Sequence, residues 1–202
     1  MVKKPNRKIV LGITGSFGSG KSTVAKMFKA RGAEVVDADL IGHGLLRPGT
    51  GVYQKIIREF GREILMPEGS ISRSKLSSLV FKDEEKLTKL NRIMHPEIIR
   101  IIKNKISSSR SGILILDAPL LIESGLNGFV DKMIVVKINR GEQLKRIASK
   151  AHLSGKQALR RIRAQMPLKD KIRLADFVID NNGSISQTRK QVGQIRRLLW
   201  RS

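Results

Sequence analysis

The chain has 202 residues, of which 40 are Lys or Arg and 17 are Asp or Glu, so its formal net charge is +23 at pH 7. The length suits one compact domain with a small insertion, and hydrophobic residues at 40% are too many for a disordered basic tail. Because the sequence contains no cysteine, a disulfide scaffold, a cysteine-ligated metal site and a cysteine nucleophile are all excluded.

The first residues of the chain resemble the basic N-terminal region of a signal peptide. Lys3, Lys4, Arg7 and Lys8 precede the apolar run 9–13. That run is too short for the apolar region of a signal peptide or for a membrane span. We therefore expect a cytoplasmic protein that does not bind membranes, which also fits the lack of cysteine.

Five short apolar runs predict buried strands, at residues 8–13, 33–36, 112–116, 133–137 and 176–180. Their apolar residues do not alternate with polar ones, as is typical of parallel strands covered on both faces. Helical patterns lie between the strands, at residues 22–31, 52–60, 73–80, 83–94, 96–107, 141–150, 155–164 and 185–200. This order predicts an α/β fold with a doubly wound sheet, in which ligands bind outside the carboxyl ends of the strands.

Two segments depart from the alternation of strands and helices. Residues 42–107 place several helices where one crossover helix would suffice, and we interpret them as an inserted helical subdomain. Residues 150–174 are basic and helix-prone, which favours a mobile lid. Residues 140–173 hold 11 basic and 2 acidic residues, so the positive charge is concentrated around this segment.

The strongest motif follows the first strand and reads G-x-x-x-x-G-K-S. It comprises Gly15, Ser16, Phe17, Gly18, Ser19, Gly20, Lys21, Ser22 and Thr23. The glycines let backbone N–H groups wrap a phosphate, and the positive end of the next helix faces the same anion. Lys21 is expected to reach the β- and γ-phosphates, and the Ser22 hydroxyl to bind Mg²⁺. The order strand, motif, helix predicts a nucleoside-triphosphate site rather than a chance glycine-rich turn.

Carboxylates follow two other predicted strands. Asp37 and Asp39 come after the second strand, where side-chain alternation puts both on one face if the strand continues. One of them could accept the proton of an acceptor hydroxyl, although Asp39 as the N-cap of a helix is the structural alternative. Asp117 follows four apolar residues, a pattern typical of a Walker B strand that holds Mg²⁺ through water.

Several basic residues are candidates for binding phosphate. Arg146 lies on the helix after the fourth strand, and a lid that closes over the site would bring further cations to the transferring phosphoryl group. The downstream cations are Lys150, Lys156, Arg160, Arg161, Arg163, Lys169, Lys171 and Arg173. For most of them a solvated helix face is the better interpretation. His95 before Pro96 is either a substrate contact or a helix boundary.

Taken together, these residues resemble the dephospho-CoA kinase family, in the same order over residues 8–183. The motifs are Thr14 with the phosphate loop, Asp37-Ala-Asp39, His95-Pro96, Pro119-Leu120-Leu-x-Glu123, Leu144-Lys-Arg146, Gln165, and Ala175-Asp176-Phe-Val-Ile-Asp-Asn181-x-Gly183. The phosphate loop occurs in many NTPases, whereas the combination with D-A-D, H-P and P-L-L-x-E is specific.

The resemblance implies a P-loop NTPase with a three-layer α/β/α fold and a five-stranded parallel sheet. It further implies a nucleotide-binding core (1–41, 108–149 and 175–202), a helical CoA-binding subdomain (42–107) and a small helical basic lid (150–174). The implied reaction transfers the γ-phosphate of ATP, with Mg²⁺, to the ribose 3′-hydroxyl of dephospho-CoA, the last step of coenzyme A synthesis.

The resemblance also implies roles for single residues. Asp39 is the expected general base, with Lys21 and Arg146 on the phosphates and Ser22 and Asp117 at the metal. On the substrate side we expect Thr14, Asp39, His95, Pro119, Leu120, Glu123 and Arg163. Asn181 and Gly183 are expected on the adenine side. Lys150 stands where the family often has a second Arg, and a lysine cannot make the bidentate contact of an arginine.

Two alternatives stay open at this point. One is another P-loop kinase, acting on nucleoside monophosphates, shikimate or gluconate. The other is a basic nucleic-acid-binding NTPase, suggested by the charge. Aromatic residues at 4% argue against a single-strand stacking platform, so we expect only adventitious, salt-sensitive binding to nucleic acid. We expect a monomer or a weak oligomer.

Overall fold

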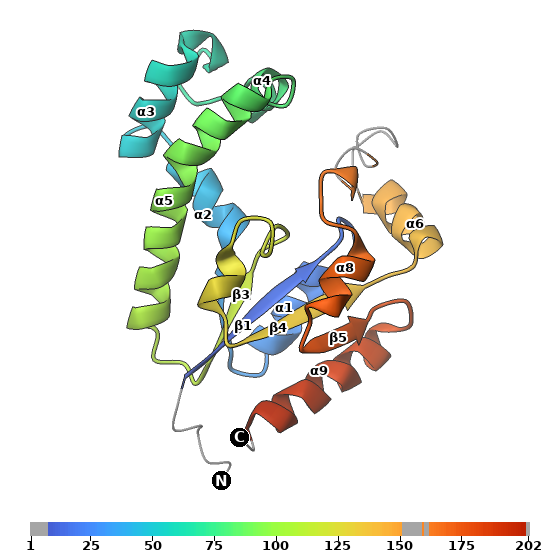
Figure 1. Cartoon of the computed structure of the whole chain (residues 1–202). Coiled ribbons are helices and arrows are strands. Elements are labelled where there is room, and N and C mark those ends of the chain that lie inside the picture. Colours follow the sequence, from blue (N-terminus) through green and yellow to red (C-terminus); the bar gives the residue numbers. More distant parts are fainter. Residues whose placement is uncertain (1–7, 151–158, 160–161, 201–202) are drawn as a thin grey trace. The chain divides into compact units, whose positions relative to one another are not determined.

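The structure is a computed structural model that describes residues 8–150, 159 and 162–200 (Figure 1). The chain divides into two compact units. Met1–Val36 with Ile106–Ser202 form one, called here the sheet unit, and Asp37–Lys105 form the other, called the helical unit.

The sheet unit is built on five strands: β1 (Ile9–Gly15), β2 (Glu34–Asp37), β3 (Ile113–Asp117), β4 (Lys132–Lys137) and β5 (Phe177–Asp180). Their order in the sheet is β2-β3-β1-β4-β5. Strand β1 is central and pairs in parallel with β3 and β4, and β4 pairs in parallel with β5. The predicted five-stranded parallel sheet of an α/β/α fold is therefore confirmed, with strand ends displaced by one or two residues.

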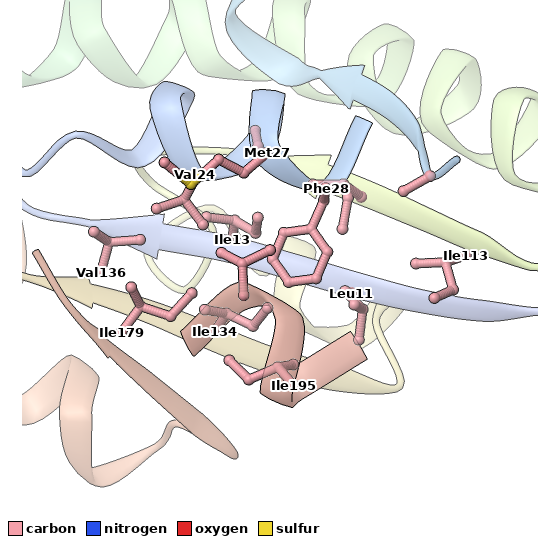
Figure 2. Packing of buried hydrophobic residues seen from close by; sticks show 14 of the residues in the cluster. Leu11, Ile13, Val24, Met27, Phe28, Ile113, Ile134, Val136, Ile179 and Ile195 are labelled. Atoms are coloured by element: carbon pink, nitrogen blue, oxygen red, sulfur yellow. The ribbon is translucent and has the colours of Figure 1, made fainter. Parts of the chain in front are cut away.

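One face of the sheet packs against α1 (Lys21–Lys29) and α9 (Ile185–Trp200), and their side chains form the main core (Figure 2). Leu11 and Ile13 of β1 contribute to this core and are completely buried. Because side chains alternate along a strand, Gly12 and Thr14 face the other side. A Cβ atom on Gly12 would meet the side chains of Leu121 and Val130, so the loop after β3 lies close against that face.

The remaining elements of the sheet unit follow β3 and β4. They are the 3-10 helix η2 (Leu126–Phe129) and the helices α6 (Arg140–Lys150) and α8 (Leu168–Arg173). Figure 1 shows α8 in front of the sheet and α1 behind it, and α8 contacts β4. Helix α8 was not predicted, and the predicted helix at 155–164 falls largely outside the described residues.

The helical unit contains α2 (Ala38–Leu45), α3 (Gly51–Phe60), η1 (Arg62–Ile64), α4 (Arg73–Val80) and most of α5 (Glu84–Ser108). The hydroxyl groups of Thr50 and Ser72 cap α3 and α4 by accepting hydrogen bonds from backbone N–H groups. The unit has its own core, in which Ile56, Phe60 and Ile64 are at most 5% exposed. The helical subdomain was predicted to begin at residue 42. This unit begins at Asp37, because α2 starts directly after β2.

Helix α5 corrects the prediction of two helices separated at Pro96. The helix runs without a break from Glu84 to Ser108 and contains Pro96 in its interior. A proline there removes one backbone hydrogen bond and costs roughly 3 kcal/mol. Apolar residues before and after the proline, including Leu90 and Ile98, pack on the same core, and this burial offsets the cost.

Across the described part of the chain, no helix is both long enough and apolar enough to span a membrane.

Candidate active site

The phosphate loop, residues 15–20, connects β1 to α1. Gly18 and Gly20 have φ angles of 80° and 87°, in the left-handed region that favours glycine. Gly20 is the N-cap of α1, and a Cβ there would also collide with the side-chain amide of Asn181. No acidic residue lies in the first turn of α1. The N-terminal N–H groups and the helix dipole therefore present positive charge to an anion at this loop.

Two glutamine side chains hold the loop from outside. The Nε2 of Gln143 on α6 donates to the Ser16 hydroxyl at 3.1 Å and to the Phe17 carbonyl at 2.6 Å. The Oε1 of Gln165 accepts the backbone N–H of Phe17 at 2.8 Å. The tip of the loop is therefore fixed by residues far away in the sequence.

A third amide, that of Asn181, supports the base of the loop. Its Nδ2 donates to the Ser19 carbonyl at 2.7 Å, and its Oδ1 accepts the Thr188 hydroxyl at 2.8 Å. Both Asn181 and Thr188 are buried. Since both ends of this amide bind protein groups, the side chain of Asn181 holds the loop in place.

Arg146 of α6 lies beside the phosphate loop, as the sequence predicted. Its Nη2 donates to the Asn181 carbonyl at 2.8 Å, and its Nε pairs with Glu142 at 3.2 Å. Its Nη1 is 3.6 Å from where a Cβ of Gly20 would stand. The guanidinium is partly exposed and lies next to the N-terminus of α1, where an anion would bind.

Lys21 forms an ion pair with Asp117 at the carboxyl edge of the sheet. Asp117 is the residue of β3 that stands opposite Ile13 of β1, and it is 2% exposed. The pair connects the first residue of α1 to the end of the neighbouring strand. The predicted proximity of Asp117 to the phosphate loop is therefore present in the structure.

The residues around this pair fit a magnesium ion. The Asp117 carboxylate and the Ser22 hydroxyl are oxygen donors, the type that Mg²⁺ prefers. Within the described ranges, no cluster of three or more His, Asp or Glu side chains could hold a metal by protein groups alone. This is the arrangement expected where substrate phosphates and water complete the coordination of Mg²⁺.

Behind the loop, a buried polar cluster joins β1, the segment after β3 and α8. Lys171 of α8 is fully buried, and its Nζ donates to the Pro119 carbonyl at 2.8 Å and pairs with Glu123 at 2.9 Å. The Thr14 hydroxyl is also buried and donates to the Pro119 carbonyl at 3.0 Å. These contacts fix the P-L-L-x-E segment against the end of β1.

Glu123 is held by more than Lys171. It also accepts the backbone N–H of Met166 at 2.9 Å. Burial raises the pKa of the Glu123 carboxyl, but the hydrogen bond from Lys171 and the backbone bonds outweigh it, so this pKa lies below its usual value. Glu123 is therefore an ionised group that ties the segment before α8 to the loop after β3.

The structure corrects two expectations for the Asp37-Ala-Asp39 motif. Strand β2 ends at Asp37 instead of continuing, and it is Asp37 that caps α2, by accepting the N–H of Leu40 at 3.0 Å. The alternative that Asp39 is the N-cap is therefore wrong. Asp39 is an exposed residue in the first turn of α2.

The other predicted site residues are scattered. His95 is half-buried within α5 of the helical unit, so it does not mark a helix boundary. Leu120 is 46% exposed, and Arg163 is exposed. Gly183 lies in the turn before α9, where Ser184 and Gln187 bond to each other's backbone N–H and form a capping box. Lys156, Arg160 and Arg161 lie outside the described residues.

Sequence reasoning did not assign roles to several residues that shape the site. Gln143 and Thr188 sit in amphipathic helical patterns that look like those of any surface helix. Lys171 was one of many lid cations, and nothing in its spacing signals complete burial. Gln165 belongs to the motifs that carry the resemblance. It is an uncharged polar residue between a basic segment and Pro167, and this position is the one feature of the sequence that could have suggested a role for it.

Comparisons with known proteins identify the family of the chain. The family profile described as dephospho-CoA kinase matches residues 9–187. The dephospho-CoA kinase of Carboxydothermus hydrogenoformans is 47% identical over 186 residues, covering 91% of this chain and 90% of the relative. That of Aquifex aeolicus is 46% identical over 195 residues, covering 95% and 97%.

Solved structures give the same assignment. The crystal structure of Thermus thermophilus TT1252 matches with a TM-score of 0.85 at 31% identity, over 96% of this chain and 99% of that one. The dephospho-CoA kinase of Campylobacter jejuni matches with a TM-score of 0.70 at 27% identity, over 95% and 97%. Shikimate kinase from Acinetobacter baumannii, with a TM-score of 0.51 at 16% identity, shares the fold alone. The resemblance carried by the sequence motifs is thus confirmed, and this chain belongs to the dephospho-CoA kinase family of enzymes.

Proposed function

We propose that this protein transfers the γ-phosphate of ATP to the 3′-hydroxyl of the ribose of dephospho-CoA, giving coenzyme A and ADP. The observation that carries the proposal is the phosphate loop with Lys21 paired to Asp117 and Arg146 beside it, in a chain that matches the family over residues 9–187. Family membership supports the class of reaction, and the loop supports ATP as the donor.

On the donor side, the protein supplies positioning and positive charge. The backbone N–H groups of the loop and of the first turn of α1 bind the phosphates of ATP. Lys21 exchanges its partner Asp117 for the β- and γ-phosphates when ATP binds, and Arg146 adds a second cation. Because Gln143, Gln165 and Asn181 already hold the loop in shape, little reorganisation is needed on binding.

Mg²⁺ would be held by the Ser22 hydroxyl and, through water, by the Asp117 carboxylate. The ion would neutralise part of the charge on the β- and γ-phosphates. Once Lys21 contacts the phosphates, the Asp117 carboxylate would accept hydrogen bonds from water on the metal.

On the acceptor side, Asp39 orients the ribose hydroxyl and accepts its proton. The residues proposed to contact dephospho-CoA are Asp39 and His95 in the helical unit and Leu120 and Glu123 in the P-L-L-x-E segment. Thr14 acts through the Pro119 carbonyl that it fixes. Arg163, which is exposed, adds a further cation on the acceptor side.

The test is direct. Purified protein is incubated with ATP, Mg²⁺ and dephospho-CoA, and coenzyme A is measured, with nucleoside monophosphates and shikimate as alternative acceptors. We expect phosphorylation of dephospho-CoA alone. Transfer to a nucleoside monophosphate but not to dephospho-CoA would contradict the proposal.

The role of Asp39 has a matched control two residues away. Asp39→Asn should lower kcat by at least about 100-fold, as expected for loss of a general base, while ATP affinity changes little. Asp37→Asn keeps a good N-cap for α2 and should retain near-normal turnover. Near-normal turnover of Asp39→Asn would remove Asp39 from this role.

A further inference from the structure

A basic hollow lies on α9, at the side where this helix meets the residues that follow α1. It has a volume of about 550 Å³. It is lined by Arg31, Ser186, Arg189, Lys190, Gly193, Gln194, Arg196 and Arg197. None of these residues belongs to the active site described above.

The two chain segments that meet at this hollow contain no carboxylate. Residues 18–33 and 181–202 hold nine of the 40 basic residues and none of the 17 acidic ones. Among the described residues, no ion pair within 4.0 Å engages Arg31, Arg189, Lys190 or Arg197. The positive charge of the hollow is therefore uncompensated by the elements that form it, which favours binding of a polyanion.

Arg31 is fixed in place by the two helices. Its Nη1 donates to the Met27 carbonyl at 3.0 Å, at the end of α1, and its Nη2 to the Arg189 carbonyl on α9 at 3.5 Å. A guanidinium held in this way has already lost part of its conformational freedom. Less entropy is then lost when it contacts a phosphate, so Arg31 is a preorganised cation on the rim of the hollow.

One apolar face of α9 is buried, while Ile185 and Leu198 of the same helix are exposed and do not line the hollow. Val192, Ile195 and Leu199 are buried in the core of the sheet unit, where Figure 2 shows Ile195 close to the side chains of the sheet. The lining of the hollow accordingly contains only charged and polar residues and one glycine. A membrane-binding helix would need exposed apolar side chains on the same face to enter the lipid.

The polar lining points to one class of partner. Arginine, lysine, serine and glutamine are the side chains that most often contact the phosphates and sugars of nucleic acids. Among the described residues, no aromatic side chain lines the hollow, which argues against stacking on unpaired bases. These features together favour the backbone of a duplex.

Gly193 is one of the residues that line the hollow. Glycine inside a helix costs up to about 1 kcal/mol relative to alanine. Here no atom lies within 4 Å of the place a Cβ would take, so no crowding requires a glycine. The missing side chain keeps the floor open between Arg189 and Arg197, which are four residues away on either side.

We propose that this basic hollow binds the phosphate backbone of a nucleic-acid duplex, without reading its sequence. Four exposed or fixed cations, Arg31, Arg189, Lys190 and Arg197, make the contacts. Counterion release by four contacts gives a slope of about −3.6 for log K against log salt, or roughly a 150-fold loss of affinity between 50 and 200 mM salt.

The experiment measures binding of the full chain to fluorescent 20-base-pair DNA and RNA duplexes across salt, with and without saturating ATP and Mg²⁺. Gly193→Glu places a carboxylate in the hollow, and Gly193→Gln is its uncharged control of the same size. Each phosphate contact contributes roughly eightfold in affinity at 0.1 M salt. We expect Gly193→Glu to lose at least this factor, and Gly193→Gln to bind like the wild type. Both variants should keep full kinase activity.

A second variant, Arg197→Gln, tests the proposal independently in case Gly193→Glu does not fold. Arg197→Gln should reduce the salt slope by about 0.9. The measurements with DNA and with RNA show which of the two duplexes binds. Binding of either duplex with this salt dependence supports the proposal. Equal affinity of the two Gly193 variants, displacement of the duplex by ATP, or binding to anionic vesicles but to neither duplex would overturn it.

Discussion

The buried cation of α8 offers the sharpest prediction for stability. Lys171→Met keeps an unbranched apolar stem of similar length and removes only the ammonium group. The ammonium is fully buried and contacts the Pro119 carbonyl and Glu123. Its loss therefore leaves Glu123 with the backbone N–H of Met166 as its remaining hydrogen bond among these contacts.

The expected loss of folding free energy depends on how deeply Lys171 and Glu123 are each buried. Removing one partner of a fully buried ion pair costs about 3–5 kcal/mol, and a hydrogen bond to a charged group contributes about 1.5–3 kcal/mol. The Glu123 side chain is 22% exposed, so water can replace part of what it loses. The Pro119 carbonyl keeps the Thr14 hydroxyl. We therefore expect a loss of about 2–3 kcal/mol, or roughly 5–10 °C in Tm for a chain of this size.

The measurement is thermal and urea unfolding of Lys171→Met, Glu123→Gln and the double variant at pH 7. Lys169→Met, an exposed lysine of the same helix, is the control and should stay within about 0.5 kcal/mol of the wild type. The pair should couple by about 1–2 kcal/mol. A coupling energy below about 0.3 kcal/mol would refute the view that Lys171 acts through Glu123.

The same pair predicts a dependence on pH. The pKa of Glu123 is lower in the folded protein than its value of about 4.5 in the unfolded chain. The ionised carboxylate therefore stabilises the fold above pH 4.5, and this stabilisation is lost as the pH falls through the folded-state pKa. In Lys171→Met this pKa rises toward its ordinary value. The loss of stability below pH 4.5 should then be smaller than in the wild type, which unfolding curves at pH 4 and pH 7 can measure.

Three further predictions concern the phosphate loop and its supports. Gly20→Ala combines a φ of 87° with a collision against Asn181, and calorimetry should show ATP binding weakened at least about tenfold. Asn181→Ala leaves the Ser19 carbonyl and the Thr188 hydroxyl without this partner, so thermal unfolding should show a loss of about 1–3 kcal/mol. The hydrogen bond from the backbone N–H of Asn182 lowers the pKa of Asp180, so the wild type should lose stability as the pH falls below about 3.8. In Asp180→Asn the free energy of unfolding should fall less steeply over this pH range, which unfolding curves at several acidic pH values can measure.

The sheet and the phosphate loop were predictable because each depends on a local pattern. Runs such as 113–116 are apolar at every position, which occurs when both faces of a strand are covered. The loop is recognisable because its glycines are required at fixed spacing by the backbone itself. Asp117 was expected near the loop because it ends a strand of a parallel sheet, whereas the place of Arg146 was implied by the resemblance to the family.

Other features depend on contacts that the sequence does not signal locally. Pro96 normally ends a helix, but α5 continues because apolar residues on both sides of it share one core. No helix was predicted over residues 38–45, and α2 begins at Ala38 because the side chain of Asp37 caps it. Lys171 looks like one of many surface lysines, and only the tertiary fold gives it Glu123 and the Pro119 carbonyl as partners. For Pro96 and Lys171, a distant contact overrides a local preference.

The supports of the phosphate loop have a consequence for the order in which the chain becomes functional during synthesis. The loop is translated early, yet the groups that fix its shape, Gln143, Gln165 and Asn181, emerge from the ribosome much later. A nascent chain that has completed β1 and α1 carries the nucleotide-binding sequence without its geometry. We therefore expect full affinity for ATP only once β5 has joined the sheet and Asn181 has reached the loop.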